Sequence, residues 1–224
     1  MGFGYKGAWI AAKGIAAEKL AASMRLTGVT KASWQLGLQR SYDPHGLKTY
    51  DSVEAVRNAE FQFPETSSVF VTPPIDGWTL AVGQRLAFFR SFAFARIPQD
   101  RYPEKLLPFI EELSKETGGT IQYFFTHRVP ETHIWVWAES GRIVRAYGYS
   151  GERGEVLFNV GSLTPGEATL RLKLPATERD LANDAKRPPD EQTVIDVAGK
   201  WSVDPTQLDE RRDVARVGLV GTLP

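Results

Sequence analysis

Three histidines, His45, His127 and His133, are the residues of this sequence best suited to acid–base or metal chemistry. His127 and His133 lie on either side of Glu131, around a predicted hairpin turn. A divalent metal accepts imidazole and carboxylate ligands, and an imidazole beside a carboxylate can act as a general base. The spacing lacks the tight helical pair or third histidine of a ligand motif. We therefore expect no metal site. One candidate function remains from these residues: a small hydrolase that uses His127 or His133 with a nearby carboxylate, which is the alternative to the binding function considered below.

Motifs for nucleophilic and phosphate chemistry do not occur in the sequence. With no Cys, thiol nucleophiles, disulfides and zinc ribbons are excluded. Neither G-x-S-x-G nor a phosphate-binding glycine loop is present, and the glycine-rich segment Gly148–Gly154 joins two predicted strands. The sequence thus predicts no catalytic residue and no cofactor, and it favours a protein that is not an enzyme.

A different chemistry, protein binding, is indicated by Arg145, Tyr147 and Tyr149. These residues alternate along one predicted strand and so share one of its faces. Tyrosine and arginine combine a large apolar area with a polar tip, and they carry much of the binding energy at interfaces. Arg128 and Glu131, in the adjoining loop, would supply a charged rim. We expect these five residues to bind a partner unless a helix or the C-terminal segment covers the face.

Arginines and aromatic residues are interleaved after residue 84, as on a platform that stacks single-stranded nucleic acid. The arginines are Arg85, Arg90, Arg96 and Arg101. The whole chain carries 27 basic and 27 acidic residues, so no net field attracts phosphates. An amphipathic segment with inward aromatic side chains is the preferred interpretation, and nucleic acid is not expected as a partner.

The hydrophobic pattern predicts an α+β fold whose antiparallel sheet is centred on residues 120–160. Segments with alternating or continuous apolar residues are separated by turn residues, and they define three strands and a fourth candidate: Thr120–Thr126, Thr132–Ala138, Ile143–Tyr149 and Glu155–Val160. Ser140 and Gly141 form the middle of the second hairpin turn. Helices are expected on at least one face of the sheet, because Trp135 and Trp137 need an apolar cover.

The pairing register of the first two strands depends on the length of the loop between them. A five-residue loop over His127–Glu131 would place Tyr123 opposite Trp135, in a core layer. The second hairpin turn would place Trp135 opposite Ala146, so Arg145 and the two tyrosines would lie on the other face. A change of one residue in either loop would exchange the faces, because side chains alternate along a strand.

The remaining expected elements flank this region. The strands are Gly7–Lys13, an alternating segment over Trp34–Leu38, Ser68–Thr72 and Trp78–Gly83. The helices are Ile15–Leu26, Pro108–Thr117, one that begins at Thr164, one from a cap at Asp190 to Ala198, and a last one from Asp204 to about Arg212. If the second helix begins earlier, at Glu104, Pro108 must kink it. One domain over residues 1–224 is expected, with 1–64 and 190–212 as candidate sub-regions.

No segment of the sequence fits a secretory signal or a membrane span. The apolar patch Ala8–Ala12 is bracketed by lysines and is shorter than the roughly 7–15 apolar residues of a signal peptide core. The segment Leu86–Ala95 contains Arg90 and falls far below the roughly 20 residues that cross a bilayer. We therefore expect a cytoplasmic protein with no membrane partner.

Three segments carry a resemblance to known sequences: Asp76–Gly83 (DGWTLAVG), Gln122–Val129 (QYFFTHRV) and Val197–Pro205 (VAGKWSVDP) with Leu208. The chain resembles an uncharacterised family of bacterial cytoplasmic proteins that is similar to immunity proteins. The resemblance extends from about Ala8 to Leu208 and carries no assigned catalytic residue. It implies a non-enzymatic protein that binds a cognate protein toxin and neutralises it by occlusion. A neighbouring toxin gene would favour this function over the hydrolase.

Overall fold

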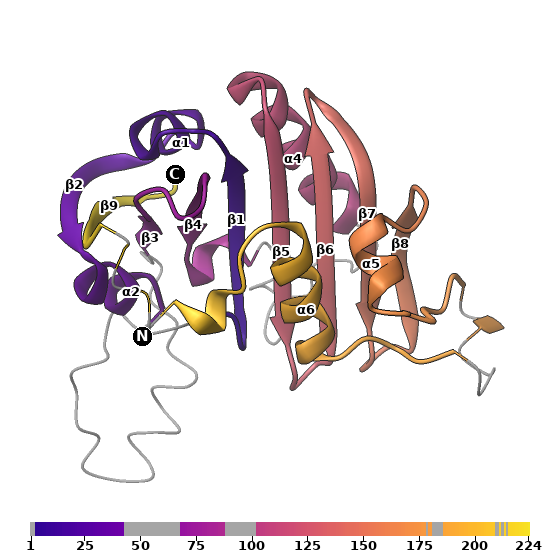
Figure 1. The fold of residues 1–224 in the computed structure, drawn as a ribbon. Coiled ribbons are helices and arrows are strands. Elements are labelled where there is room, and N and C mark those ends of the chain that lie inside the picture. Colours follow the sequence, from indigo (N-terminus) through magenta and orange to yellow (C-terminus); the bar gives the residue numbers. More distant parts are fainter. Residues whose placement is uncertain are drawn as a thin grey trace, which may run out of the picture.

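One antiparallel sheet of nine strands organises the part of the chain that the structure describes (Figure 1). The computed structural model describes residues 3–42, 68–87, 102–177, 179–180, 186–208, 211, 213 and 215–224. The strands follow the order β2-β9-β3-β4-β1-β5-β6-β7-β8 across the sheet. Their bounds are β1 Gly7–Lys13, β2 Thr27–Ser33, β3 Ser68–Val71, β4 Trp78–Val82, β5 Thr120–His127, β6 Thr132–Glu139, β7 Arg142–Ser150, β8 Glu155–Val160 and β9 Val217–Thr222. The predicted combination of helices with an antiparallel sheet is confirmed.

The first face of the sheet shares a buried cluster with α1 (Ala17–Ser23) and α4 (Tyr102–Thr117). Tyr123 and Val136 contribute from the central strands, Leu20 from α1 and Ile110 from α4. Side chains three or four positions apart lie on one side of a helix, which explains how Leu106, Ile110 and Leu113 of α4 are all buried. In Figure 1, α4 lies behind β5, β6 and β7.

The second face shares its buried cluster with α2 (Trp34–Tyr42) and α6 (Glu191–Trp201). Trp9 stacks on Phe124 with ring centroids 5.1 Å apart, and Trp201 of α6 lies 5.9 Å from Phe124. In Figure 1, α6 and the short α5 (Pro165–Thr169) lie in front of the strands β5 to β8. This second face carries most of the polar residues considered for function.

The register of the β5–β6 hairpin differs from the expected one by one residue. His127 pairs with Thr132, so the loop is the four residues 128–131, and Tyr123 lies opposite Val136. Trp135 lies opposite Phe124 on one side and Tyr147 on the other. Trp135 is fully buried, as expected for a core layer, but it shares a face with Tyr147. The expected separation of these two residues was wrong, because the register shift between Trp137 and Ala138 places Trp135 opposite Tyr147 and not opposite Ala146. The shorter first loop has another effect: it puts Tyr123 on the face away from Trp135.

The second hairpin turn formed where it was expected. Ser140 and Gly141 have φ angles of 47° and 82°, and Glu139 pairs with Arg142 across this two-residue turn. Positive φ at both central positions is the geometry that hairpins with two-residue loops favour. A register shift follows between Trp137 and Ala138, so Trp137 pairs with Arg145 and not with the expected Val144.

Several other elements differ from the sequence-based expectations. The segment from Trp34 is the helix α2 and not a strand: Ser33 accepts a hydrogen bond from the amide of Leu36 at 3.3 Å, as at a helix start, and Leu38 is buried one turn after Trp34. Helix α4 begins before Pro108, as in the alternative with an earlier start at Glu104, and it contains this proline. Where the last helix was expected to begin, the described residues form a 3₁₀ helix, η4, over Pro205–Gln207; part of the segment up to Arg212 lies outside the described residues. Strands β2 and β9 were not expected. No helix in the described ranges is long and apolar enough to cross a membrane.

Candidate interaction site

The loop after β5, the turn after β7 and the start of α6 meet at one end of the sheet, which we call the hairpin end. It comprises Tyr5, Lys6, residues 128–131, residues 151–154 and residues 190–192. The Gly151 amide donates to the Glu131 carbonyl at 2.9 Å, and the Glu152 amide donates to the Pro130 carbonyl at 3.2 Å. The two hairpin tips are therefore joined to each other through their backbones.

Glu191, at the start of α6, bonds to two other segments of the hairpin end. Its carboxylate accepts a hydrogen bond from the Lys6 amide at 3.0 Å and lies 3.3 Å from Nε of Arg128. The Tyr5 hydroxyl donates to the side-chain carbonyl of Gln192 at 3.1 Å. Segments distant in the sequence thus position the loop at residues 128–131.

The loop at residues 128–131 exposes an apolar residue between two charges. Val129 is 73% exposed, and the side chain of Arg128 is 64% exposed. Glu131 is also exposed and has a φ of 46°. Of the five residues expected to bind a partner, Arg128 and Glu131 are therefore accessible, and the structure places them on the same short loop.

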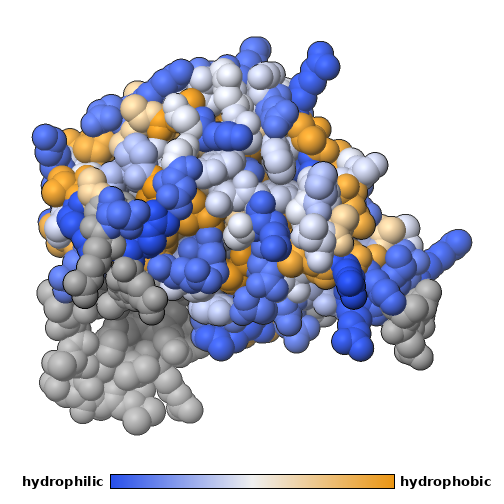
Figure 2. Space-filling model, in the orientation of Figure 1, coloured by the Kyte–Doolittle hydropathy of each residue, from blue (hydrophilic) through white to orange (hydrophobic). Residues whose placement is uncertain are grey.

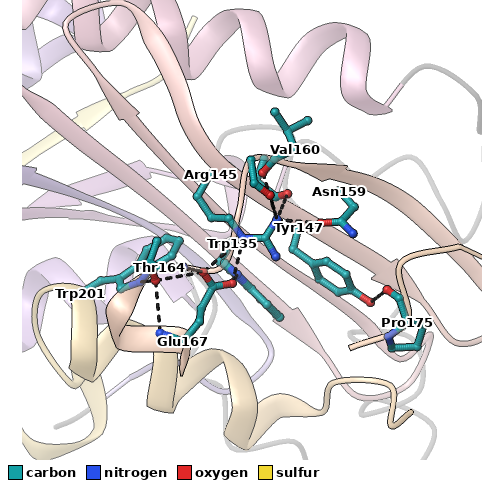
Figure 3. A network of polar contacts seen from close by, with 11 residues as sticks. Trp135, Arg145, Tyr147, Asn159, Val160, Thr164, Glu167, Pro175 and Trp201 are labelled. Carbon is teal, nitrogen blue, oxygen red and sulfur yellow. Dashed lines mark hydrogen bonds and ion pairs between the residues drawn. The ribbon is translucent and has the colours of Figure 1, made fainter. Parts of the chain in front are cut away.

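Arg145, also expected to bind a partner, is buried in a polar network beneath α5 (Figure 3). Its Nε donates to the two carboxylate oxygens of Glu167 at 3.0 and 3.2 Å. One terminal nitrogen donates to the side chain of Asn159 at 2.7 Å and to the Val160 carbonyl at 3.0 Å. Burying an ion pair is tolerated when further hydrogen bonds satisfy its polar atoms, and Nε and one terminal nitrogen of Arg145 have such partners.

Glu167 is the acceptor on which this network converges. It accepts hydrogen bonds from the Trp135 indole at 2.8 Å and from the backbone and hydroxyl of Thr164 at 2.8 and 2.9 Å. Thr164 caps α5 in return, and its hydroxyl also accepts from the Trp201 indole at 2.8 Å. The network therefore joins α5 and α6 to the sheet, and its chemistry is that of a structural anchor.

Tyr147 and Tyr149 are buried as well. Tyr147 stacks on Trp135 at 4.9 Å, and its hydroxyl donates to the Pro175 carbonyl at 2.9 Å. Burial raises the pKa of both tyrosines above the ordinary value of 10. Together with Arg145, they form no exposed surface, because α5 and the segment after it cover their face. This is the covered alternative considered from the sequence.

No hydrogen bond or ion pair between described residues joins His127 or His133 to a carboxylate, although the charge of Glu191 acts on His127 and that of Asp190 on His133. His133 is buried, and its Nδ1 lies 2.9 Å from the Thr126 hydroxyl. Burial lowers the pKa of His133 to about 4, and burial together with the nearby Lys6 charge lowers the pKa of His127. Glu131 packs over Gly151, where an added Cβ would overlap its carboxylate. Among the described residues, no three potential ligands are grouped as a metal would require.

The residues outside the described ranges include His45, Arg90, Arg96 and Arg101. Arg85, the remaining member of the basic and aromatic pattern, lies in the 3₁₀ helix η1 (Gln84–Leu86). Glu167 is the residue that the sequence reasoning missed. The sequence did contain a sign of its role in the helix cap, since Thr164 and Glu167 have the spacing of a capping box. No neighbouring residue indicated that Arg145 would be the partner of Glu167.

The described residues thus present two polar sites with different properties. Both carboxylate oxygens of Glu167 accept internal hydrogen bonds, whereas the hairpin end exposes charged and apolar side chains to solvent. Comparison with protein-family models, curated proteins and solved structures gives no match for this chain. The geometry of the hairpin end is therefore the main guide to function.

Proposed function

We propose that this chain is a non-enzymatic bacterial binding protein, specifically a cytoplasmic immunity protein that neutralises a cognate protein toxin by occlusion. The observation that carries the proposal is the hairpin end, where Val129 is 73% exposed between Arg128 and Glu131. An apolar centre with a charged rim is the usual anatomy of a protein interface. The resemblance of three sequence segments to immunity-like proteins supports the same class of function.

The tethered loop suits tight binding. Its backbone is bonded to the turn at residues 151–154, and Arg128 is paired with Glu191. A loop that is already ordered loses less conformational entropy on association than a free one, and more of its contact energy remains as affinity. Charges of both signs on the rim would select a partner with the complementary pattern and oppose others.

Occlusion follows from the shape of such a site. Both hairpin tips and the start of α6 lie at the same end of the sheet, at the lower edge of Figure 1. A projecting loop with an apolar tip is complementary to a concave catalytic cleft, which is lined mainly by apolar side chains. In this mechanism Val129 enters the cleft of the toxin, while Arg128 and Glu131 pair with charges on its margin.

The test is co-expression with the toxin-like product of a neighbouring gene, followed by calorimetric titration of the purified pair. The double variant Arg128→Glu, Val129→Asp is expected to abolish protection of the host cells. It should weaken binding roughly 1,000-fold or more, because two hot-spot residues that contribute about 2 kcal/mol each lose about 4 kcal/mol together, and about 1.4 kcal/mol corresponds to a tenfold change.

The matched control is Val144→Asp, an exposed valine on β7 outside the hairpin end. This variant should protect as well as the unchanged protein, and both variants should melt at nearly its temperature. Protection that survives the double variant would refute the proposed surface. Failure of the unchanged protein to bind any toxin encoded beside it would refute the immunity function.

A further inference from the structure

The strand β2 has an accessible edge and two accessible faces. It is the last strand on its side of the described sheet and pairs there only with β9. Six of its seven residues are exposed, and Ala32 is the buried one. All five residues of the interior strand β4 are buried by comparison. Within the described ranges no strand pairs with the outer edge of β2, which leaves its outer backbone donors and acceptors to another strand.

The surroundings of β2 are basic although the chain as a whole is neutral. From Lys19 to Tyr42 the chain contains four basic residues, Lys19, Arg25, Lys31 and Arg40. No acidic residue occurs from Lys19 to Tyr42. Arg25 and Lys31 are exposed, and neither forms an ion pair with another described residue. Among the described residues, Arg25 and Lys31 thus carry positive charges beside β2 that would attract carboxylates.

Apolar side chains lie along the same strip as Lys31. Lys31 pairs with Leu219 of β9, and Val217 pairs with Ser33, so these residues share one face of the sheet. Val29 lies beside Gly221 on that face. Val29 is 41% and Val217 55% exposed. A cation between exposed valines would match an extended segment in which acidic and apolar residues occur together.

We propose that the β2 edge binds an acidic, extended segment of a partner protein, which adds to the sheet as a further strand. Backbone hydrogen bonds would supply affinity, and a carboxylate opposite Lys31 would supply selectivity. The same charges disfavour a second copy of this chain, because β2 paired with β2 would bring Arg25 and Lys31 close to their own counterparts. The exposed valines and free backbone amides favour a peptide over nucleic acid. This inference is independent of the hairpin end.

The probe is a fluorescein-labelled peptide of alternating glutamate and valine, titrated with the full-length protein by fluorescence anisotropy. We expect binding that weakens with added salt, and no binding of the matched lysine–valine peptide. Lys31→Glu should weaken binding by about tenfold or more, because it replaces an attraction with a repulsion. The matched control Lys105→Glu, an exposed lysine on α4, should leave the dissociation constant unchanged.

Strand addition is separated from simple charge attraction by the peptide backbone. In a second acidic peptide, every other backbone nitrogen is methylated, at the positions whose N–H groups would point towards β2. This peptide keeps its charge but loses those hydrogen-bond donors, and it should not bind. Binding of the unmethylated peptide should slow amide hydrogen exchange in β2. If Lys31→Glu shifts the melting temperature, Lys31→Gln provides the second variant, with a smaller loss of affinity.

Three outcomes would overturn the proposal. These are equal binding of the methylated peptide, unchanged binding by the Lys31 variants, or tighter binding of a single-stranded oligonucleotide of the same charge. The toxin titration does not depend on any of them, so the two proposals fail separately.

Discussion

Of the arginine–glutamate pairs among the described residues, Arg145–Glu167 and Arg128–Glu191 have similar distances and opposite surroundings. Arg145 and Glu167 approach to 3.0 Å, and their side chains are 2% and 0% exposed. Arg128 and Glu191 approach to 3.3 Å, but the Arg128 side chain is 64% exposed. The first pair lies beneath α5, and the second lies at the hairpin end, where water reaches the guanidinium.

The comparison teaches that burial, more than distance, decides what an ion pair does. Inside the protein both charges have lost their hydration, so each needs the other and every additional hydrogen bond. At the surface, water and salt screen the attraction, and such pairs contribute little to stability. A weakly held surface charge can exchange its partner for one on another molecule, which makes Arg128 and not Arg145 the candidate contact.

The largest expected effect is from Glu167→Ala, which should reduce the free energy of unfolding by about 3–5 kcal/mol. The substitution leaves the Arg145 charge buried without its partner and removes the acceptor for the Trp135 indole. Urea unfolding at pH 7 measures the loss. Glu152→Ala, at an exposed position of the hairpin end, is the control and should change stability by less than about 0.5 kcal/mol. A loss below about 1 kcal/mol for Glu167→Ala would remove the distinction between the two pairs.

A second, intermediate effect concerns pH. Burial holds the pKa of His133 at about 4, whereas an unfolded chain has the ordinary value of 6.5. The unfolded state therefore binds more protons between these pH values, and stability falls as the pH decreases from about 6.5 towards 4. The loss should reach about 3 kcal/mol at pH 4.

The pH effect is isolated by comparing the protein with His133→Gln. Urea unfolding of both should be followed from pH 7 to pH 4. The difference in their unfolding free energies should narrow as the pH falls, because the variant has no imidazole to protonate. Parallel pH profiles would show that the buried state of His133 does not depress its pKa, and would weaken the contrast with the exposed hairpin end.

The smallest expected effect on stability is from Arg128→Ala, which should lower the free energy of unfolding by less than about 1 kcal/mol. Its guanidinium is largely hydrated, so removal leaves no buried charge behind. Thermal unfolding of this variant beside Arg145→Ala measures the contrast directly. Equal losses for the two arginines would contradict the assignment of one pair to stability and the other to binding.

Much of the local structure was predictable because it depends on neighbouring residues. Ser140 and Gly141 tolerate the positive φ angles of a tight hairpin turn, and their turn lies where the sequence placed it. The caps at Thr164 and Asp190 also start helices as expected. These features depend on side chains that bond within three residues of themselves, so a short stretch of sequence contains the whole interaction.

The missed elements depend on distant partners. Strand β9 lies between β2 and β3, which are far earlier in the sequence, and no alternating pattern marks β2 because both of its faces are exposed. Trp34 and Leu38 fit either a strand or a helix, since positions four apart share a face in both. In the structure both side chains belong to the helix α2 and are buried against the second face of the sheet.

By itself, the sequence determined the class of fold, the four strands of residues 120–160 and the absence of cysteine chemistry. It also selected Arg128, Glu131, Arg145, Tyr147 and Tyr149 as residues suited to binding. Only the tertiary structure decided which of them solvent can reach. A register shift between Trp137 and Ala138 placed Trp135 on the side of Tyr147, and a glutamate 22 positions after Arg145 took up its charge beneath α5. Burial is a property of everything packed around a residue, so no local pattern can specify it.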